Sequence, residues 1–87
     1  MSYMFEINYE LEGINTKTFY GVQNQNFNLL KSSFPTLKIT GRDNFVFAMG
    51  NRETLDLLKK KLDDVSDYIS KHNSLEIKQL ESLLKLK

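Results

Sequence analysis

The chain has few side chains that could act as acids, bases or metal ligands. Three carboxylates, Asp63, Asp64 and Asp67, lie within a helical pattern, and a further pair is Glu10 and Glu12. A metal ion or an acid–base pair needs several such groups to converge on one point. No histidine or cysteine stands at ligand spacing beside the three aspartates. We therefore interpret them as a solvated helix face, with a metal or acid–base site as the alternative.

The single histidine, His72, lies beside Asn73 at the expected junction of two helices. A histidine at a helix end interacts favourably with the terminal carbonyl groups, whereas an imidazole elsewhere often serves as a catalytic base or metal ligand. Because no candidate nucleophile is close to His72 in the sequence, we favour the helix-end interpretation and assign it no site.

A phosphate-binding loop needs closely spaced glycines, so that backbone amides can approach the anion, followed by Lys and Ser or Thr. The four glycines of this chain, Gly13, Gly21, Gly41 and Gly50, are isolated from one another. The chain therefore lacks a P-loop. We expect no catalytic residue, no metal and no cofactor in it, and no enzymatic activity of its own.

The basic side chains form two groups. Lysines 59–61 lie on a long expected helix, where nearby aspartates neutralise them, and a solvated face is the favoured interpretation. The second group is Lys38, Arg42 and Arg52, around an expected hairpin. Arg42, near Asn44 at a tight turn, could offer phosphate and base-edge contacts to a single strand, although solubility of the turn explains it equally well.

Periodic apolar residues predict the elements that carry these groups. Residues 3–11 alternate between apolar and polar side chains, which predicts a half-buried strand. Residues 18–20 are expected to add a short extended piece. A helix of about ten residues should follow, capped by Asn24 and stopped by Pro35.

Two alternating runs, residues 37–40 and 45–49, flank the turn residues 41–44 and predict a β-hairpin. A helix is then expected over residues 52–71, with its apolar residues at spacings of three and four. Asn73 and Glu76 have the spacing of a capping box for a last helix. That helix is still apolar at Leu83, Leu84 and Leu86, so we expect these leucines to need a partner surface.

The order strand, helix, strand, strand, helix, helix predicts an α+β domain with a three-stranded, mostly antiparallel sheet packed by helices. The chain has 87 residues, of which 40% are hydrophobic, which suits a single small folded domain. It has no Cys, and no apolar stretch approaches the roughly 18 residues of a membrane span. We expect a cytoplasmic protein without membrane contact.

The charge of the whole chain says little about a partner. Twelve Lys and Arg against 11 Asp and Glu give a net charge of +1. Contact with a nucleic acid must therefore depend on a local basic patch, because binding scales with the phosphates neutralised.

Several short segments of the chain resemble the N-terminal region of the PhoH-like proteins, the phosphate-starvation-inducible predicted ATPases. The segments are residues 20–26 (YGVQNQN), 29–31 (LLK), 34–39 (FPTLKI) and 42–44 (RDN), with Gly50. The resemblance extends over about residues 14–84. It is a loose pattern of small signatures and includes no catalytic string.

This resemblance implies a KH-like accessory domain, residues 1–87, detached from a larger protein whose P-loop ATPase domain is absent here. That domain would bind ATP and magnesium, and such cytoplasmic proteins are linked to RNA metabolism and phosphate limitation. A KH domain clamps the nucleic-acid backbone with a Gly-X-X-Gly loop between two helices. Here Gly21-Val22-Gln23-Asn24 has one glycine and no expected preceding helix. The implied contacts are Gly21, Gln23, Asn24, Lys31, Lys38 and Arg42.

Two functions stay open at the level of sequence. In the first, the domain binds single-stranded RNA weakly and delivers it to the attached ATPase. In the second, it packs against the ATPase domain or mediates homo-oligomer contacts through the apolar side of the last helix. The near-neutral charge and the incomplete clamp favour the structural role, whereas the resemblance favours RNA. The balance leans to RNA by a small margin.

Overall fold

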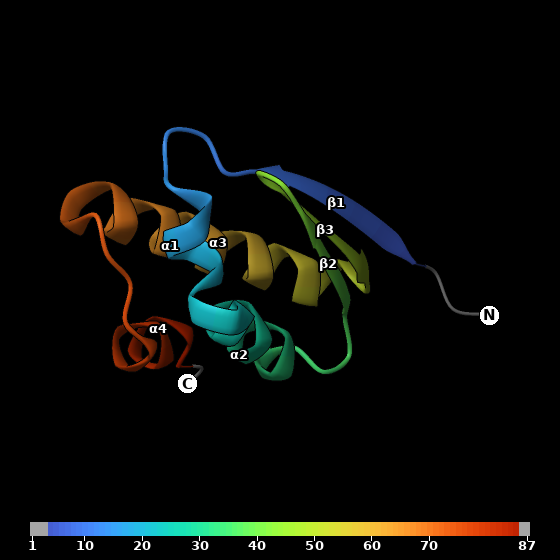
Figure 1. Cartoon of the computed structure of the whole chain (residues 1–87). Coiled ribbons are helices and arrows are strands. Elements are labelled where there is room, and N and C mark those ends of the chain that lie inside the picture. The colour runs from blue at the N-terminus through green and yellow to red at the C-terminus, as the bar shows by residue number, and fades with distance from the viewer. Residues whose placement is uncertain (1–3, 86–87) are drawn as a thin grey trace.

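The computed structural model describes residues 4–85 (Figure 1). Its elements follow one another in the order β1 (Phe5–Glu10), α1 (Thr16–Tyr20), the short 3₁₀ turn η1 (Val22–Asn24), α2 (Gln25–Ser33), β2 (Lys38–Arg42), β3 (Phe45–Gly50), α3 (Arg52–His72) and α4 (Ile77–Leu84). The α+β class and the predicted order of elements are confirmed, with α1 and η1 as additions. Tyr3 and Leu86, used in the sequence patterns, lie outside the described residues.

The sheet has the strand order β1-β3-β2, and both neighbouring pairs are antiparallel. The hairpin between β2 and β3 is confirmed, but its loop is shorter than expected. Gly41 and Arg42 belong to β2, where they pair with Val46 and Phe45, and the turn consists of Asp43 and Asn44. Asp43 has a φ of 53°, a left-handed conformation that Asp tolerates better than most residues.

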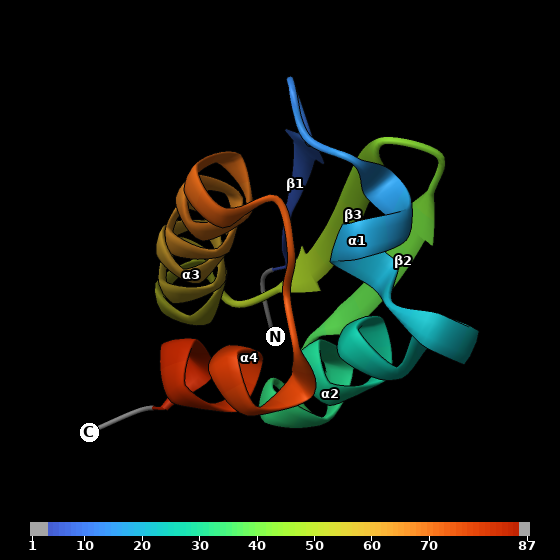
Figure 2. The same cartoon turned by 60° about the vertical axis from the view of Figure 1, so that its left-hand side comes forward.

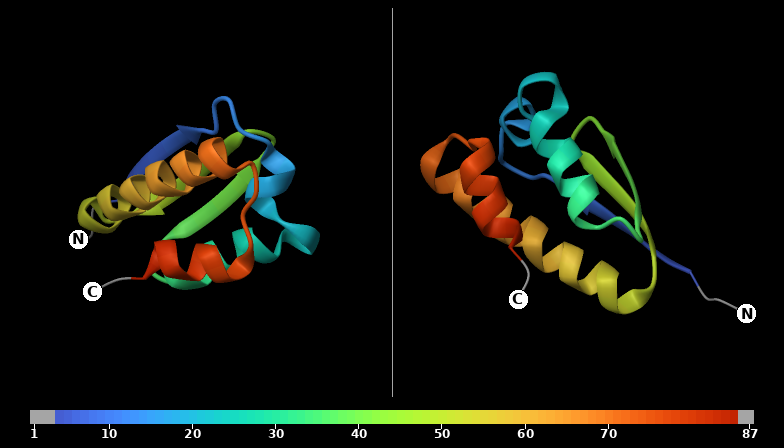
Figure 3. Two further views of the ribbon diagram at one scale, coloured as in Figure 1. Left: turned by 90° about the vertical axis from the view of Figure 1, so that its left-hand side faces the viewer. Right: turned by 90° about the horizontal axis from the view of Figure 1, so that it is seen from below.

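All the helices lie on one side of the sheet, and the other side is uncovered (Figures 1 and 3). Two glycines allow this close packing. A Cβ atom on Gly41 would come within 2.7 Å of the Tyr20 ring, and one on Gly50 would clash with the side chain of Leu37. Gly41 therefore lets the helices pack directly on β2, and Gly50 leaves room for Leu37 in the connection between α2 and β2.

The apolar stripe of α3 supplies much of the core. Its five apolar residues at spacings of three and four are all at most 2% exposed: Leu55, Leu58, Leu62, Val65 and Ile69. Burial of each such side chain contributes about 1.5–3 kcal/mol. The predicted helix over residues 52–71 is thus confirmed, and packing of this stripe explains why it forms.

The expected extended piece at residues 18–20 is wrong, because these residues belong to α1. The side chain of Asn15 caps this helix by accepting a hydrogen bond from the Lys17 backbone amide at 2.9 Å. Phe19 is buried in the core, and the ring of Tyr20 lies 5.1 Å from that of Phe27 in α2. Tertiary packing of two aromatic residues stabilises a helix too short to form alone.

Of the two predicted caps, one is confirmed in position and the other is wrong. Asn24 is the N-cap residue of α2, but its side chain makes no capping hydrogen bond and its backbone is left-handed, with a φ of 61°. Asn73 ends α3, with a φ of 57° and its amide bonded to the Ile69 carbonyl at 2.7 Å. The residue before α4 is Glu76, whose side chain makes no capping bond. Asparagine suits both left-handed positions because it tolerates positive φ.

The last helix finds its partner surface within the domain. Leu80 and Leu84 are 2% and 4% exposed, and Leu83 packs half-buried against the same core. Helix α4 lies beside α2 and α3 (Figure 2). The expectation that Leu83 and Leu84 need an external partner is therefore corrected.

Candidate nucleic-acid interface

The segment Gly21–Asn24 joins two helices, α1 and α2. The sequence-based view that no helix precedes it was wrong, because α1 had been read as extended chain. Three of its residues have positive φ: Gly21 at 81°, Gln23 at 52° and Asn24 at 61°. Such a conformation is rare for Gln and is favoured mainly by Gly and Asn. We call residues 21–24 the α1–α2 loop.

The buried side chain of Asn26 anchors this loop. It is 1% exposed, and its Nδ2 donates hydrogen bonds to the Thr18 carbonyl at 3.2 Å and to the Leu75 carbonyl at 3.0 Å. A Cβ on Gly21 would lie 2.9 Å from the Asn26 side chain. The buried side-chain amide of Asn26 therefore links α1, α2 and the α3–α4 connection. Its close contact with position 21 leaves room there only for glycine.

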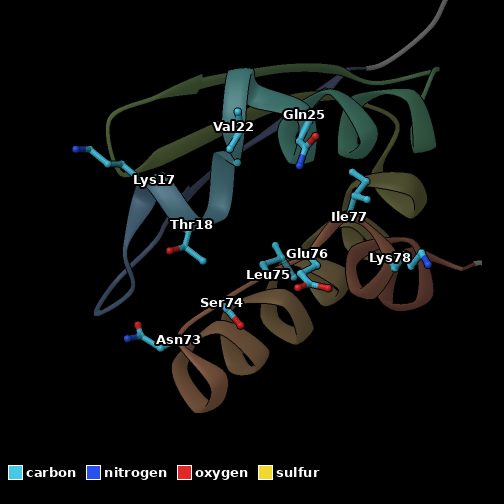
Figure 4. Close-up of a pocket in the computed structure, with 11 residues that line it drawn as sticks. Lys17, Thr18, Val22, Gln25, Asn73, Ser74, Leu75, Glu76, Ile77 and Lys78 are labelled. Atoms are coloured by element: carbon cyan, nitrogen blue, oxygen red, sulfur yellow. The ribbon is translucent and has the colours of Figure 1, made fainter.

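A cleft of about 570 Å³ opens beside the loop. One wall comes from α1 and the α1–α2 loop, and the other is the segment 73–78 that leads into α4 (Figure 4). Gln25 points from the first wall toward the second. Lys17 and Lys78 line opposite ends of the cleft, and Glu76 is the acidic residue lining it. The amino groups of both lysines point outward, away from the middle of the cleft (Figure 4), so the positive charge lies at its two ends.

A second hollow of about 400 Å³ lies next to the same loop. It shares Lys17, Gly21 and Val22 with the cleft and adds Thr16, Tyr20 and Asn24. Val22 is 74% exposed, a large value for an apolar side chain. The exposed side chain of Val22 therefore lies between two hollows of the surface.

The six residues named from the sequence do not form one surface. Gly21, Gln23 and Asn24 belong to the α1–α2 loop, and Lys31 lies farther along α2 with its Nζ 5.7 Å from the centre of the Phe27 ring. Lys38 and Arg42 are both exposed residues of β2.

The register of the sheet places Lys38 and Arg42 on the uncovered face. They alternate with Ile39, which is buried, and with Gly41, which meets the helices. Their side chains therefore lie on the side of the sheet away from the α1–α2 loop. Lys17, Val22 and Lys78 were missed from the sequence, because α1 was not recognised and the α3–α4 connection comes close only in the folded chain.

Two tyrosines form hydrogen bonds between the sheet or its hairpin and the helices. The Tyr20 hydroxyl donates to the Asp43 carbonyl at 3.2 Å, and burial, with the charge of Asp43, raises the pKa of Tyr20. The Tyr9 hydroxyl donates to Asp63 at 2.5 Å. Burial and this bond raise the pKa of Tyr9. Both tyrosines tie the sheet and its hairpin to the helical layer.

Two of the three aspartates singled out in α3 make side-chain contacts. Asp63 accepts the bond from Tyr9, and Asp67 pairs with Lys71 at 3.3 Å. Within residues 4–85, no three His, Cys, Asp or Glu side chains are grouped so as to hold a metal ion. His72 is the last residue of α3, and its ring lies 4.3 Å from that of Tyr68.

Comparison with protein-family models, with curated proteins and with solved structures finds no match to this chain. The resemblance to the PhoH-like proteins therefore stays a prediction. Among the helices of residues 4–85, none is long and apolar enough to cross a membrane.

Proposed function

We propose that this chain is a non-catalytic domain that binds single-stranded RNA weakly through its α1–α2 loop. The observation that carries the proposal is the loop itself, which joins two helices, begins with a required glycine and ends with a left-handed asparagine. A KH domain clamps the nucleic-acid backbone with a Gly-X-X-Gly loop, and Asn24 stands where the second glycine would be. Asparagine is the residue that best replaces glycine at positive φ.

Positive charge around the loop supports the same proposal. Lys17 and Lys78 line the cleft, and Lys31 lies on α2, the helix that follows the loop. The amides at the start of α2 add a further partial positive charge that suits a phosphate. Neutralising about three phosphates of a single strand gives a slope near −2 for log affinity against log salt. The binding is therefore weak and sensitive to salt.

In this proposal the chain is the N-terminal accessory domain of a PhoH-like protein in the cytoplasm. The attached P-loop domain would bind ATP and magnesium, and the domain described here would present RNA to it.

The second candidate function is a structural one, in which the domain packs against the ATPase domain or forms a homo-oligomer. The uncovered face of the sheet favours a contact of this kind.

Charge reversal beside the loop tests the RNA proposal. We expect Lys17→Glu to weaken binding of a fluorescent single-stranded RNA about tenfold or more at low salt and to flatten its salt dependence. The matched control is Lys60→Glu, an exposed lysine of α3 that lines none of the hollows at the loop. Equal effects of the two variants would mean that only net charge matters and would overturn the loop as the binding site.

A further inference from the structure

The uncovered face of the sheet carries an ordered pattern of side chains. Directly opposed residues of antiparallel neighbours lie on the same face of a sheet. The register therefore gives three rows across the strands β1, β3 and β2: Glu6–Met49–Lys38, Asn8–Phe47–Thr40 and Glu10–Phe45–Arg42. We call these nine residues the open face.

The open-face residues of the middle strand β3 are apolar and do not belong to the core. The rings of Phe45 and Phe47 stack with their centres 6.2 Å apart. Phe47 is 39% exposed, and none of Phe45, Phe47 and Met49 belongs to the core or to the half-buried residues packed against it. A hollow of about 120 Å³ beside Phe47 and Met49 is bordered by Glu6 and Lys38.

The two edge strands carry opposite charges. Strand β1 presents Glu6 and Glu10, and strand β2 presents Lys38 and Arg42. Among residues 4–85 none of these four makes an ion pair, although Glu10 accepts a hydrogen bond from Asn44 at 3.3 Å. The acidic column would repel RNA phosphates, so this pattern suits a partner that carries both charges in the same arrangement.

We propose that the open face binds a second copy of this chain. A two-fold axis parallel to β3 places β1 of one copy over β2 of the other and keeps each row in register. Glu6 then faces the partner's Lys38, Glu10 faces the partner's Arg42, and Phe47 meets the partner's Phe47. An axis perpendicular to the strands would instead bring acidic residues together, so the charges select one orientation.

The size of the open face predicts a weak dimer. Three strands about 4.8 Å apart and five or six residues long cover a flat area on the order of 300 Å². A standard interface buries about 800 Å² on each partner. The two sheets would pack about 10 Å apart and aligned at about −30°. We therefore expect a dissociation constant in the micromolar range or above.

This inference does not rest on RNA binding. The α1–α2 loop lies in the helical layer, and the open face lies on the opposite side of the sheet. The dimer would leave both loops free. RNA binding and self-association can therefore be lost independently of one another.

Sedimentation equilibrium of the chain from about 10 µM to about 1 mM tests the proposal, since this range brackets the expected weak affinity. Glu6→Lys alone and Lys38→Glu alone each place like charges opposite one another, and each should weaken the dimer about tenfold. An equimolar mixture of the two variants restores both opposite-charge contacts in a heterodimer, so we expect it to associate nearly as well as the unsubstituted chain. A misfolded variant could not produce this rescue.

Phe47→Thr replaces an aromatic residue with a β-branched one that also favours strands, and it should remove the central apolar contact. Leu57→Gln, at a residue of α3 that is 37% exposed, is the control and should leave the dimer intact. A chain that stays monomeric throughout the range, or a dimer unaffected by the open-face variants, would overturn the proposal. Loss of RNA affinity in Phe47→Thr without any self-association would also overturn it, and would assign the face to RNA.

Discussion

The side-chain amide of Asn26 donates a hydrogen bond to the backbone carbonyl of Leu75, which lies 49 residues farther along the chain. The same nitrogen also bonds the Thr18 carbonyl. One buried side chain thus fixes the relative position of both walls of the cleft. The shape of the candidate RNA site depends on Asn26 more than on any residue that would touch RNA.

Replacement of Asn26 should therefore be costly. Asn26→Ala leaves two carbonyl groups without their donor, and we expect the free energy of unfolding to fall by about 1–3 kcal/mol. The control is Asn28→Ala, an exposed asparagine of the same helix, which should change stability by under about 0.5 kcal/mol. Urea denaturation measures both. Equal stability of the two variants would contradict the role given to Asn26.

Gly21→Ala should destabilise the chain more than Gly13→Ala. Both glycines have positive φ, at 81° and 72°, so both variants suffer backbone strain of about 1 kcal/mol. Only at Gly21 would the new Cβ lie 2.9 Å from Asn26, whereas nothing lies within 4 Å at Gly13. We expect an additional loss of roughly 1–3 kcal/mol at Gly21 from this overpacking, measured by urea denaturation. Equal losses would mean that the contact with Asn26 is readily relaxed.

The pH dependence of stability above neutrality should report on the tyrosines. Burial, together with the bond to Asp63, raises the pKa of Tyr9 above 10.0, and burial with the charge of Asp43 does the same for Tyr20. The folded chain therefore holds these protons more tightly than the unfolded chain. This contribution is fully present below pH 10 and is lost as pH rises through the folded-state pKa values.

Tyr9→Phe provides the comparison for this effect. It removes one titrating group, so the free energy of unfolding of the variant should fall less steeply between about pH 9.5 and 11 than that of the unsubstituted chain. At pH 7 the variant should be somewhat less stable, because the bond to Asp63 is lost. Parallel pH profiles would show that Tyr9 has the same pKa in the folded and unfolded chains.

The periodic parts of the fold could be predicted from the sequence. Alternation located the β2–β3 hairpin, and the spacing of Leu55, Leu58 and Leu62 located α3. Helix α1 could not be found in this way, because five residues hold no apolar repeat. Its local signals are Asn15 at the N-cap and Gly21 at the C-cap, and its stability comes from Phe19 and Tyr20 packing on distant residues.

Alternation also separates the two faces of a strand without saying which face is covered. In β3 the larger apolar residues, Phe45 and Phe47, belong to the uncovered face, and the smaller Val46 and Ala48 meet the helices. Side-chain size alone would suggest the reverse. For the same reason, Lys38 could not be separated from the loop residues before the positions of the helices were known.

The most direct test of the central claim is an NMR titration of the chain with a short, mixed-sequence single-stranded RNA at low and then physiological salt. RNA bound at the α1–α2 loop should shift the backbone amides of residues 17–26 and 73–78, around the cleft, and these shifts should shrink as salt rises. The amides of the open face should not respond. A spectrum that stays unchanged at about 1 mM RNA, a concentration that detects even very weak binding, would contradict RNA binding at the α1–α2 loop.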